Sequence, residues 1–202
     1  MHVAIAGNIG CGKTTLTSIL AKHFKWEPIY EAMESNPYIE LFYEDMRRWA
    51  FNLQIYFLNT RFRRVVDARS KYDKIIQDRT LFEDACIFAP NLYEMGLMTT
   101  RDFETYKAMF ELLSSFVPIP DLVIYMKASE PTLIRQILKR GRAYEASISL
   151  EYIKTLNLRY EEWINNYTGR YIVIDMDEMD LDIPEDLNKI IEKINAEING
   201  LF

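Results

Sequence analysis

A glycine-rich segment close to the amino terminus constrains this chain more than any other feature. Residues 7–14 read Gly-Asn-Ile-Gly-Cys-Gly-Lys-Thr, the pattern of a glycine, four free positions and then Gly-Lys-Thr. An apolar run at residues 3–6 precedes the segment and a helical pattern at residues 15–23 follows it, so we expect a strand, a loop and a helix. Backbone N–H groups in such a loop surround a phosphate, and the helix adds its positive end. The segment therefore predicts that the chain binds a nucleoside triphosphate.

Two side chains of this phosphate loop have predicted roles of their own. The Lys13 ammonium is expected to reach the outer phosphates. The Thr14 hydroxyl is expected to hold Mg²⁺, because this cation prefers oxygen ligands and can be shared with the nucleotide. The alternative, a glycine-rich turn with an incidental lysine, leaves the strand–loop–helix context unexplained. The predicted nucleotide-binding residues are Gly7, Asn8, Ile9, Gly10, Cys11, Gly12, Lys13, Thr14 and Thr15.

Length, charge and cysteine content narrow the class of protein. With 202 residues, of which 49% are hydrophobic, the chain can build one sizeable core, so we expect a single domain over residues 1–202. A net charge of −6 with scattered basic residues argues against a nucleic-acid partner and favours a small substrate. Two cysteines give no disulfide framework. A strand within two residues of Met1 leaves no room for a signal peptide, and no apolar run approaches the ~20 residues of a membrane span, so a cytoplasmic location without membrane contact is expected.

Acidic residues follow two of the predicted strands. Glu31 comes after the extended run of residues 28–30, and Asp78 comes after the apolar run of residues 74–77. Ligands of parallel sheets bind at the carboxyl ends of the strands, so Glu31 is expected beside the phosphates and Asp78 where a carboxylate orients Mg²⁺. Arg79, the next residue, could brace a phosphoryl oxygen. For Glu31, a solvated carboxylate in a turn is the alternative.

A long amphipathic helix is predicted over residues 48–70, with apolar residues at steps of three and four. Gln54, Phe57 and Arg61 share one face of this helix. They form either a wet stripe on the helix or a base pocket, in which the amide of Gln54 pairs with the edge of a nucleobase. Asp84 and Phe88 are four residues apart and are expected on one face of a further helix.

The rest of the chain alternates helices and strands. Further helices are expected over residues 36–47, 100–116, 130–138, 149–167 and 184–198, and buried strands over residues 121–126 and 171–174. The whole pattern gives an α/β fold with about five parallel strands and helices on both faces. Residues 139–145 read Lys-Arg-Gly-Arg-Ala-Tyr-Glu and form either a solvated helix end or a mobile lid whose arginines reach a transferring phosphoryl group.

Several of these features are specific when they occur together. They are the phosphate loop, Glu31, Asn36-Pro37-Tyr38, Trp49 with Gln54, Asp78-Arg79-Thr80 and the basic segment that ends at Glu145. As a set they resemble the deoxyribonucleoside kinases, the family of deoxycytidine, deoxyguanosine and deoxyadenosine kinases, and within it the bacterial deoxyadenosine kinases. The resemblance runs nearly end to end. It implies a P-loop kinase fold, with a five-stranded parallel sheet flanked by helices on both faces and a short arginine lid at about residues 139–148.

The resemblance also implies roles in catalysis. Glu31 would be the general base that takes the proton from the 5′-hydroxyl of a deoxynucleoside, and Arg79 would hold that carboxylate ionised and steady the phosphate. Thr14 and Asp78 would attend the Mg²⁺ that accompanies ATP or another nucleoside triphosphate donor. The implied catalytic residues are Lys13, Glu31, Arg79, Arg140 and Arg142.

For the nucleoside, the resemblance implies contacts from Tyr43 and Glu145 to the 3′-hydroxyl of the sugar. Arg61 and Asp84 match the pair that addresses the base in members that accept purines and cytosine, which favours deoxyadenosine, then deoxyguanosine or deoxycytidine. Gln54 would pair with the base edge, Phe88 would stack on the base and Phe57 would limit the space. The implied substrate-binding residues are Glu31, Tyr43, Gln54, Phe57, Arg61, Arg79, Asp84, Phe88 and Glu145.

Three other functions are alternatives. A thymidylate-type nucleoside monophosphate kinase shares the loop, the Asp-Arg pair and the lid, but the carboxylate of Glu31 would repel a second phosphate. A GTP-binding switch is disfavoured because the chain lacks Asp-x-x-Gly and Asn-Lys-x-Asp. A weakly catalytic regulatory subunit is favoured only by Gln136, which stands where the animal enzymes of the family place a third lid arginine. The resemblance further implies a homodimer formed through the helices at residues 48–70 and 100–116.

Overall fold

One parallel sheet organises the fold. The structure is a computed structural model and describes residues 1–31 and 36–200. Within these residues the strands are β1 (His2–Gly7), β2 (Glu27–Ile29), β3 (Ile75–Asp78), β4 (Leu122–Lys127) and β5 (Tyr171–Asp175). Their order is β2-β3-β1-β4-β5, and every neighbouring pair is parallel. The predicted five-stranded parallel sheet is therefore confirmed.

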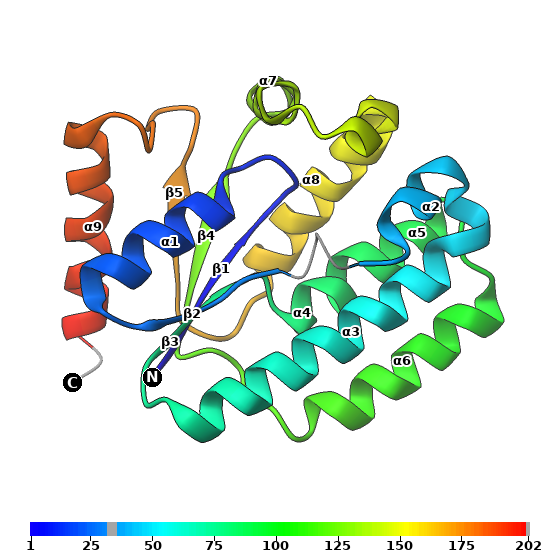
Figure 1. The fold of residues 1–202 in the computed structure, drawn as a ribbon, viewed down its shortest axis with the longest axis horizontal. Coiled ribbons are helices and arrows are strands. Elements are labelled where there is room, and N and C mark those ends of the chain that lie inside the picture. Colours follow the sequence, from blue (N-terminus) through cyan, green and yellow to red (C-terminus); the bar gives the residue numbers. More distant parts are fainter. Residues whose placement is uncertain (32–35, 201–202) are drawn as a thin grey trace.

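Helices cover both faces of the sheet (Figure 1). One face carries α1 (Lys13–Phe24) and α9 (Pro184–Asn199), and the other carries α3 (Met46–Lys71) and α8 (Leu150–Asn165). The helix α6 (Thr100–Ser114) runs along α3, and the short helix α2 (Ile39–Glu44) lies beside α3 as well. The helix α7 (Glu130–Arg140) lies beyond the carboxyl ends of the strands, at the top of the view. The predicted α/β class with helices on both faces is confirmed.

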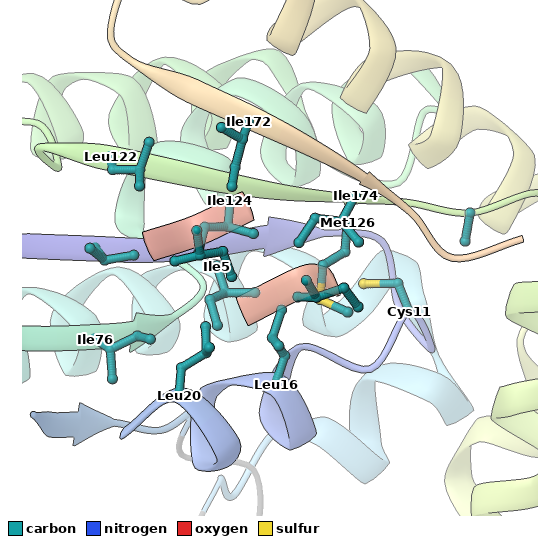
Figure 2. Packing of buried hydrophobic residues seen from close by; sticks show 14 of the residues in the cluster. Ile5, Cys11, Leu16, Leu20, Ile76, Leu122, Ile124, Met126, Ile172 and Ile174 are labelled. Carbon is teal, nitrogen blue, oxygen red and sulfur yellow. The ribbon is translucent and has the colours of Figure 1, made fainter. Parts of the chain in front are cut away.

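Side chains alternate between the two faces along the central strands. Val3 and Ile5 of β1 pack with α1 and α9, whereas Ala4 and Ala6 belong to a cluster that packs against Trp163 of α8. Figure 2 shows the first of these layers, whose labelled members include Ile5, Cys11, Leu16, Leu20, Ile124 and Met126. Because both faces are buried, β1 and β4 read as continuous apolar runs in the sequence.

The segment predicted as one helix over residues 36–47 is divided in the structure. Its last residues belong to α3, which begins at Met46 rather than at the predicted residue 48. The division lies at Asp45, whose φ of −144° and ψ of 84° interrupt the helix. The side chain of Asp45 accepts a hydrogen bond from the Arg48 N–H at 3.0 Å, so the same residue caps the amino terminus of α3.

The predicted helix around Asp84 and Phe88 has an unexpected geometry. It consists of α4 (Leu81–Glu83), a π-helical turn η1 (Asp84–Phe88) and α5 (Ala89–Glu94). The Ala89 N–H donates to the Asp84 carbonyl oxygen, and Pro90, next along, has no N–H to donate. Turns of this kind occur frequently at functional sites, and both Asp84 and Phe88 are buried.

The segment predicted as a lid begins where α7 ends. Gly141 terminates α7 in the left-handed region, at φ 67°, and a 3₁₀ turn η2 (Ala143–Ser147) follows it. The helix predicted over residues 100–116 ends earlier, at Ser114, ahead of Pro118 and Pro120. In the part of the chain that the structure describes, no helix combines the length and the apolar composition needed to span a membrane.

Candidate active site

A cavity of about 810 Å³ opens at the carboxyl ends of the strands. The phosphate loop, α3, η1, α7 and the loop after β5 all contribute to its lining, although they lie far apart in the sequence. The predicted site residues that line it are Ile9, Gly10, Cys11, Gly12, Lys13, Thr14, Thr15, Glu31, Tyr43, Gln54, Phe57, Arg79, Asp84, Phe88, Arg140, Arg142 and Glu145. The remaining ones, Gly7, Asn8, Arg61 and Asp78, are buried. The structure thus gathers the predicted residues around one cavity.

The phosphate loop has a backbone that requires glycine. Gly10 and Gly12 have φ angles of 91° and 95°, in the left-handed region that side chains other than hydrogen disfavour. Inside the loop, Lys13 Nζ donates to the Asn8 carbonyl oxygen at 2.8 Å. Cys11 is buried, as expected of a small residue within this loop, and burial raises the pKa of its thiol. The curled backbone and the inward ammonium can together receive the phosphates of a nucleotide.

Thr14 and Asp78 contact each other at the amino terminus of α1. The Thr14 hydroxyl donates to Asp78 Oδ2 at 2.5 Å, and Asp78 Oδ1 is buried without a hydrogen-bond partner among the described residues. Burial raises the pKa of Asp78, and the Lys13 charge opposes that shift. The described residues contain no cluster of three or more His, Cys, Asp or Glu side chains arranged for a metal. One carboxylate with one hydroxyl nevertheless fits Mg²⁺, which takes its remaining ligands from phosphates and water.

Glu31 is an enclosed carboxylate between two guanidinium groups. Its side chain is 14% exposed, so the alternative of a solvated turn residue is wrong. It forms an ion pair with Arg61 Nη2, and Arg79 Nη1 lies 3.7 Å from Glu31 Oε1. Burial raises the pKa of Glu31, but the charges of Arg79 and Arg61 outweigh burial and lower the pKa to about 2. The family resemblance implies this role for Arg79 and only a contact with the base for Arg61, so the ion pair of Arg61 with Glu31 is an addition.

Arg61 also contacts Asp84, so it bridges two carboxylates. Arg61 Nη1 lies 2.6 Å from Asp84 Oδ2, and the two side chains are 5% and 1% exposed. The guanidinium carbon of Arg61 also lies 4.6 Å from the centroid of the Phe57 ring. The alternative of a wet stripe on α3 is therefore wrong, because Gln54, Phe57 and Arg61 are all buried.

Gln54 and Phe88 supply an amide and an aromatic ring to the same cavity. Gln54 Oε1 is buried and has no hydrogen-bond partner within the described part of the chain. An unpaired buried acceptor costs free energy, which a bound donor can recover. The Arg79 guanidinium carbon lies 4.4 Å from the centroid of the Phe88 ring. The cavity thus offers a flat apolar surface and an unused hydrogen-bond acceptor.

The two predicted lid arginines converge on Glu145. Arg140 Nε donates to Glu145 Oε2 at 3.0 Å and Arg140 Nη2 to Oε1 at 2.5 Å, and Arg142 Nη1 reaches the same Oε1 at 3.4 Å. Beside them the rings of Tyr43 and Tyr144 stack, with centroids 5.7 Å apart. Burial raises the pKa of Tyr43, so its hydroxyl stays protonated. Gln136 and Lys139 line the cavity nearby.

Sequence reasoning missed two parts of the site. One is Glu83, which is fully buried and accepts hydrogen bonds from the Gly7 N–H and from the hydroxyl of Tyr160. Burial raises the pKa of Glu83, and the Arg79 charge opposes that shift. The pattern Thr-x-x-Glu at residues 80–83, a capping box, is the signal that could have identified it. The other is the loop after β5, at residues 176–183, which lines the cavity with several acidic side chains.

Comparison with known proteins identifies relatives of this chain. A family model described as deoxynucleoside kinase matches residues 3–199. The deoxyadenosine/deoxycytidine kinase of Bacillus subtilis is 36% identical over 190 residues, which cover 93% of this chain and 87% of that protein. The deoxyguanosine kinase of Lactobacillus johnsonii is 37% identical over 210 residues, 95% of this chain and 92% of that protein. A solved structure of deoxyadenosine kinase from M. mycoides, with products dCMP and a flexible dCDP bound, has a TM-score of 0.87 and 35% identity, and the match covers 97% of this chain and all of that one.

Proposed function

The chain belongs to the deoxynucleoside kinase family, and we propose that it transfers the γ-phosphoryl group of ATP to the 5′-hydroxyl of a deoxynucleoside, in nucleotide salvage. The preferred acceptor in this proposal is deoxyadenosine. The observation that carries the proposal is the enclosed carboxylate of Glu31, which faces the phosphate-loop cavity between Arg61 and Arg79. The whole chain is taken as one catalytic domain.

In the proposed reaction, Glu31 accepts the proton of the 5′-hydroxyl. The hydroxyl oxygen attacks the γ-phosphorus, and the bond from that phosphorus to the bridging oxygen of ADP breaks. Glu31 is ionised at neutral pH, because its guanidinium neighbours stabilise the charge. Arg79 lies close enough to Glu31 to contact the transferring group as well. Lys13 supplies positive charge to the outer phosphates from inside the loop.

Mg²⁺ is the proposed cofactor, held by Asp78 and Thr14. When bound with ATP, Mg²⁺ supplies positive charge to the β- and γ-phosphates. Asp78 is rigid in this role because it ends β3, where Ile5 of β1 is its neighbour across the sheet.

The lid arginines are proposed to act on the phosphates once the nucleoside is bound. Glu145 pairs with both Arg140 and Arg142 in the structure. We assign Glu145 and Tyr43 to the 3′-hydroxyl of the sugar. When the 3′-hydroxyl donates a hydrogen bond to one Glu145 oxygen, the ion pairs of Glu145 with the two arginines weaken. The arginines are then available to the transferring phosphoryl group. Gln136 adds no charge to the lid, and Lys139 is paired with Asp182 at 3.2 Å.

Deoxyadenosine is preferred in this proposal because of the polar groups around the base. Phe88 and Phe57 enclose the base, and Gln54 offers its unpaired carbonyl oxygen to an amino group. The Arg61 and Asp84 pair presents a donor and an acceptor, which suit a ring nitrogen with an exocyclic amino group better than the methyl edge of thymine. One relative described above is named as a deoxyadenosine/deoxycytidine kinase and the other as a deoxyguanosine kinase. Deoxyguanosine and deoxycytidine therefore rank after deoxyadenosine as proposed acceptors.

A panel of acceptors tests the proposal. The chain is incubated with ATP, Mg²⁺ and each of the four deoxynucleosides or dTMP, and the products are separated by chromatography. We expect deoxyadenosine monophosphate to form fastest. Formation of dTDP from dTMP, without phosphorylation of any nucleoside, would support a thymidylate-type kinase instead, although a second phosphate would meet the negative charge of Glu31. Nucleotide binding without turnover would support a regulatory subunit.

We further propose a cytoplasmic homodimer. Large apolar side chains are exposed on and after α6, where Leu112 is 56% and Phe116 67% exposed, and Met109 on the same helix is 42% exposed. A second copy of the chain would cover them. Both cysteines are free, which suits a reducing compartment. Light scattering at micromolar concentration should give the mass of two chains, and the mass of one would contradict the dimer.

A further inference from the structure

We propose that Glu83 is a positioning residue for phosphoryl transfer. It fixes the position of the Arg79 guanidinium relative to Gly7, the first residue of the phosphate loop. This role rests on the proposed kinase reaction, in which Arg79 faces Glu31 and the transferring group. Glu83 does not line the cavity, so it acts through the groups that it contacts.

Both oxygens of Glu83 are used, and their donors come from separate parts of the fold. Oε1 accepts from the Gly7 N–H at 3.3 Å and from the Tyr160 hydroxyl at 2.9 Å. Oε2 accepts from the Thr80 N–H at 2.8 Å and from the Thr80 hydroxyl at 3.4 Å. Gly7 ends β1, Thr80 follows β3 and Tyr160 belongs to α8. One carboxylate therefore joins the start of the phosphate loop to the turn that carries Arg79.

Arg79 is held by its surroundings rather than by one hydrogen bond. Its Nη2 donates to the Gly7 carbonyl oxygen at 3.2 Å, while Nη1 lies 3.7 Å from Glu31 and Nε lies 3.9 Å from Glu83. Nε has no hydrogen-bond partner among the residues described here. The backbone of Arg79 has a φ of 63°, a conformation that a residue other than glycine keeps only when its neighbours enforce it. Gly7 thus binds Glu83 with its N–H and Arg79 with its carbonyl oxygen.

A cap alone does not require this side chain to be a carboxylate. The capping box uses one oxygen for the Thr80 N–H, and a neutral amide such as glutamine could supply that acceptor. A fully buried carboxylate carries a far larger desolvation cost than an amide. The second oxygen, Oε1, contacts the first residue of the phosphate loop, Gly7, and lies near the Arg79 guanidinium that faces Glu31. Without the charge of Glu83, Arg79 loses one of the acidic groups that attract it and shifts toward Glu31 and Asp84.

Three variants separate this role from a structural one. Glu83→Gln keeps the size and removes the charge, and Glu83→Asp keeps the charge and shortens the side chain. Tyr160→Phe removes one hydrogen bond from Oε1 and leaves the carboxylate itself in place. We expect kcat to fall ~10- to 100-fold in Glu83→Gln, the loss typical of a misplaced catalytic group, with the KM for the nucleoside little changed. Glu83→Asp should keep more of kcat than Glu83→Gln. Tyr160→Phe should lose less kcat than Glu83→Gln, because the carboxylate and its contacts with Gly7 and Thr80 remain.

The outcomes that overturn the proposal are distinct. If Glu83→Gln keeps more activity than Glu83→Asp, or if all three variants lose kcat only in proportion to their urea midpoints, Glu83 serves folding alone. If Glu83→Gln does not fold, the test compares Glu83→Asp with Tyr160→Phe at the same fraction of folded protein. The proposal then requires a lower kcat in Glu83→Asp, and equal kcat values overturn it. A wild-type chain that phosphorylates none of the four deoxynucleosides overturns the kinase function, and this role with it.

Discussion

The Thr14 hydroxyl donates to Asp78 Oδ2 across 2.5 Å, although 64 residues separate them in the chain. The contact follows from the sheet, because β1 and β3 are parallel neighbours and Ile5 lies beside Asp78. The end of β3 is thereby brought to the first turn of α1, where the phosphate loop ends. Asp78 Oδ1 is buried there without a partner among the described side chains, so an oxygen is available for a cation.

Asp78→Asn should raise the Mg²⁺ concentration needed for half-maximal activity by ~10- to 100-fold, because an amide oxygen is neutral and binds a hard cation more weakly. The measurement is a Mg²⁺ titration of initial rates at saturating ATP and deoxynucleoside. Asp67→Asn is the matched control, since Asp67 is 63% exposed and Lys71 is its ion-pair partner among the described residues. An unchanged Mg²⁺ requirement in Asp78→Asn would remove this carboxylate from the metal site.

Glu31→Gln should lower kcat by roughly 10²- to 10⁴-fold, because it removes the proposed general base and keeps its shape. Binding of the deoxynucleoside, measured by calorimetry without ATP, should stay close to that of the wild type. Glu44→Gln, at the exposed end of α2, serves as the control. Near-wild-type kcat in Glu31→Gln would show that another group accepts the proton.

The predicted carboxyl ends of the strands indicated best where residues of the site lie. Glu31 and Asp78 lie at the ends of their strands, as expected, because a parallel sheet brings the carboxyl ends of its strands to one edge, whatever the details of packing. The phosphate loop was predictable for a similar reason, since its glycines, Lys13 and Thr14 are adjacent in sequence. Local chemistry and one topological rule therefore sufficed for the centre of the site.

Pairings between distant side chains could not be predicted in the same way. Nothing in the spacing of Arg61 shows that one guanidinium would meet both Glu31 and Asp84, because that depends on how α3 lies against η1 and the end of β2. The boundary between the two helices was predicted after residue 47 and lies at Asp45, because an amphipathic pattern that continues across it conceals a capping aspartate. Glu83 was missed as a site residue because the capping-box pattern predicts a contact for only one of its oxygens. The pattern does not predict that the other oxygen accepts from the Gly7 N–H.

The stability of the protein should fall below pH 6.5 because of His2. This residue is buried, and Arg69, Asp121 and the terminal ammonium are the charged groups around it. Burial lowers the pKa of His2 from 6.5 to about 4. The unfolded chain therefore binds the proton first as the pH falls, and stability decreases between pH 6.5 and 4, by about 3 kcal/mol in total.

Urea unfolding between pH 7 and 4 tests this expectation. His2→Asn should show a flatter dependence on pH than the wild type, because an amide does not titrate and its oxygen can accept from Arg69 as Nδ1 does. His23→Asn is the control, because His23 is exposed on α1 and is the only other histidine in the sequence. Equal slopes for the wild type and His2→Asn would contradict the assignment.

Arg61 and Asp84 should differ in what their removal costs, because Arg61 has a second partner. Asp84→Ala leaves Arg61 paired with Glu31, whereas Arg61→Met leaves the buried Asp84 carboxylate without its cation. Burial raises the pKa of Asp84 to about 7 even with Arg61 opposing that shift, so Asp84 becomes protonated in Arg61→Met and the ion pair is lost. Arg61→Met should therefore lose more stability to urea and more activity on every deoxynucleoside.

The double variant Arg61→Met with Asp84→Ala removes both charges, so it should recover part of the stability that Arg61→Met loses. Its cavity gains apolar room near Phe57, where the methyl group of thymine can fit, and loses the donor and acceptor proposed to recognise adenine. Thymidine should therefore gain relative to deoxyadenosine when kcat/KM is measured for the four deoxynucleosides. Arg79, whose Nη1 lies 3.7 Å from Glu31 in the wild-type structure, is unchanged in this variant, so the proposed general base should remain ionised and activity should be retained. If the single variants and the double variant all keep the wild-type ratios among the four deoxynucleosides, the pair does not select the base.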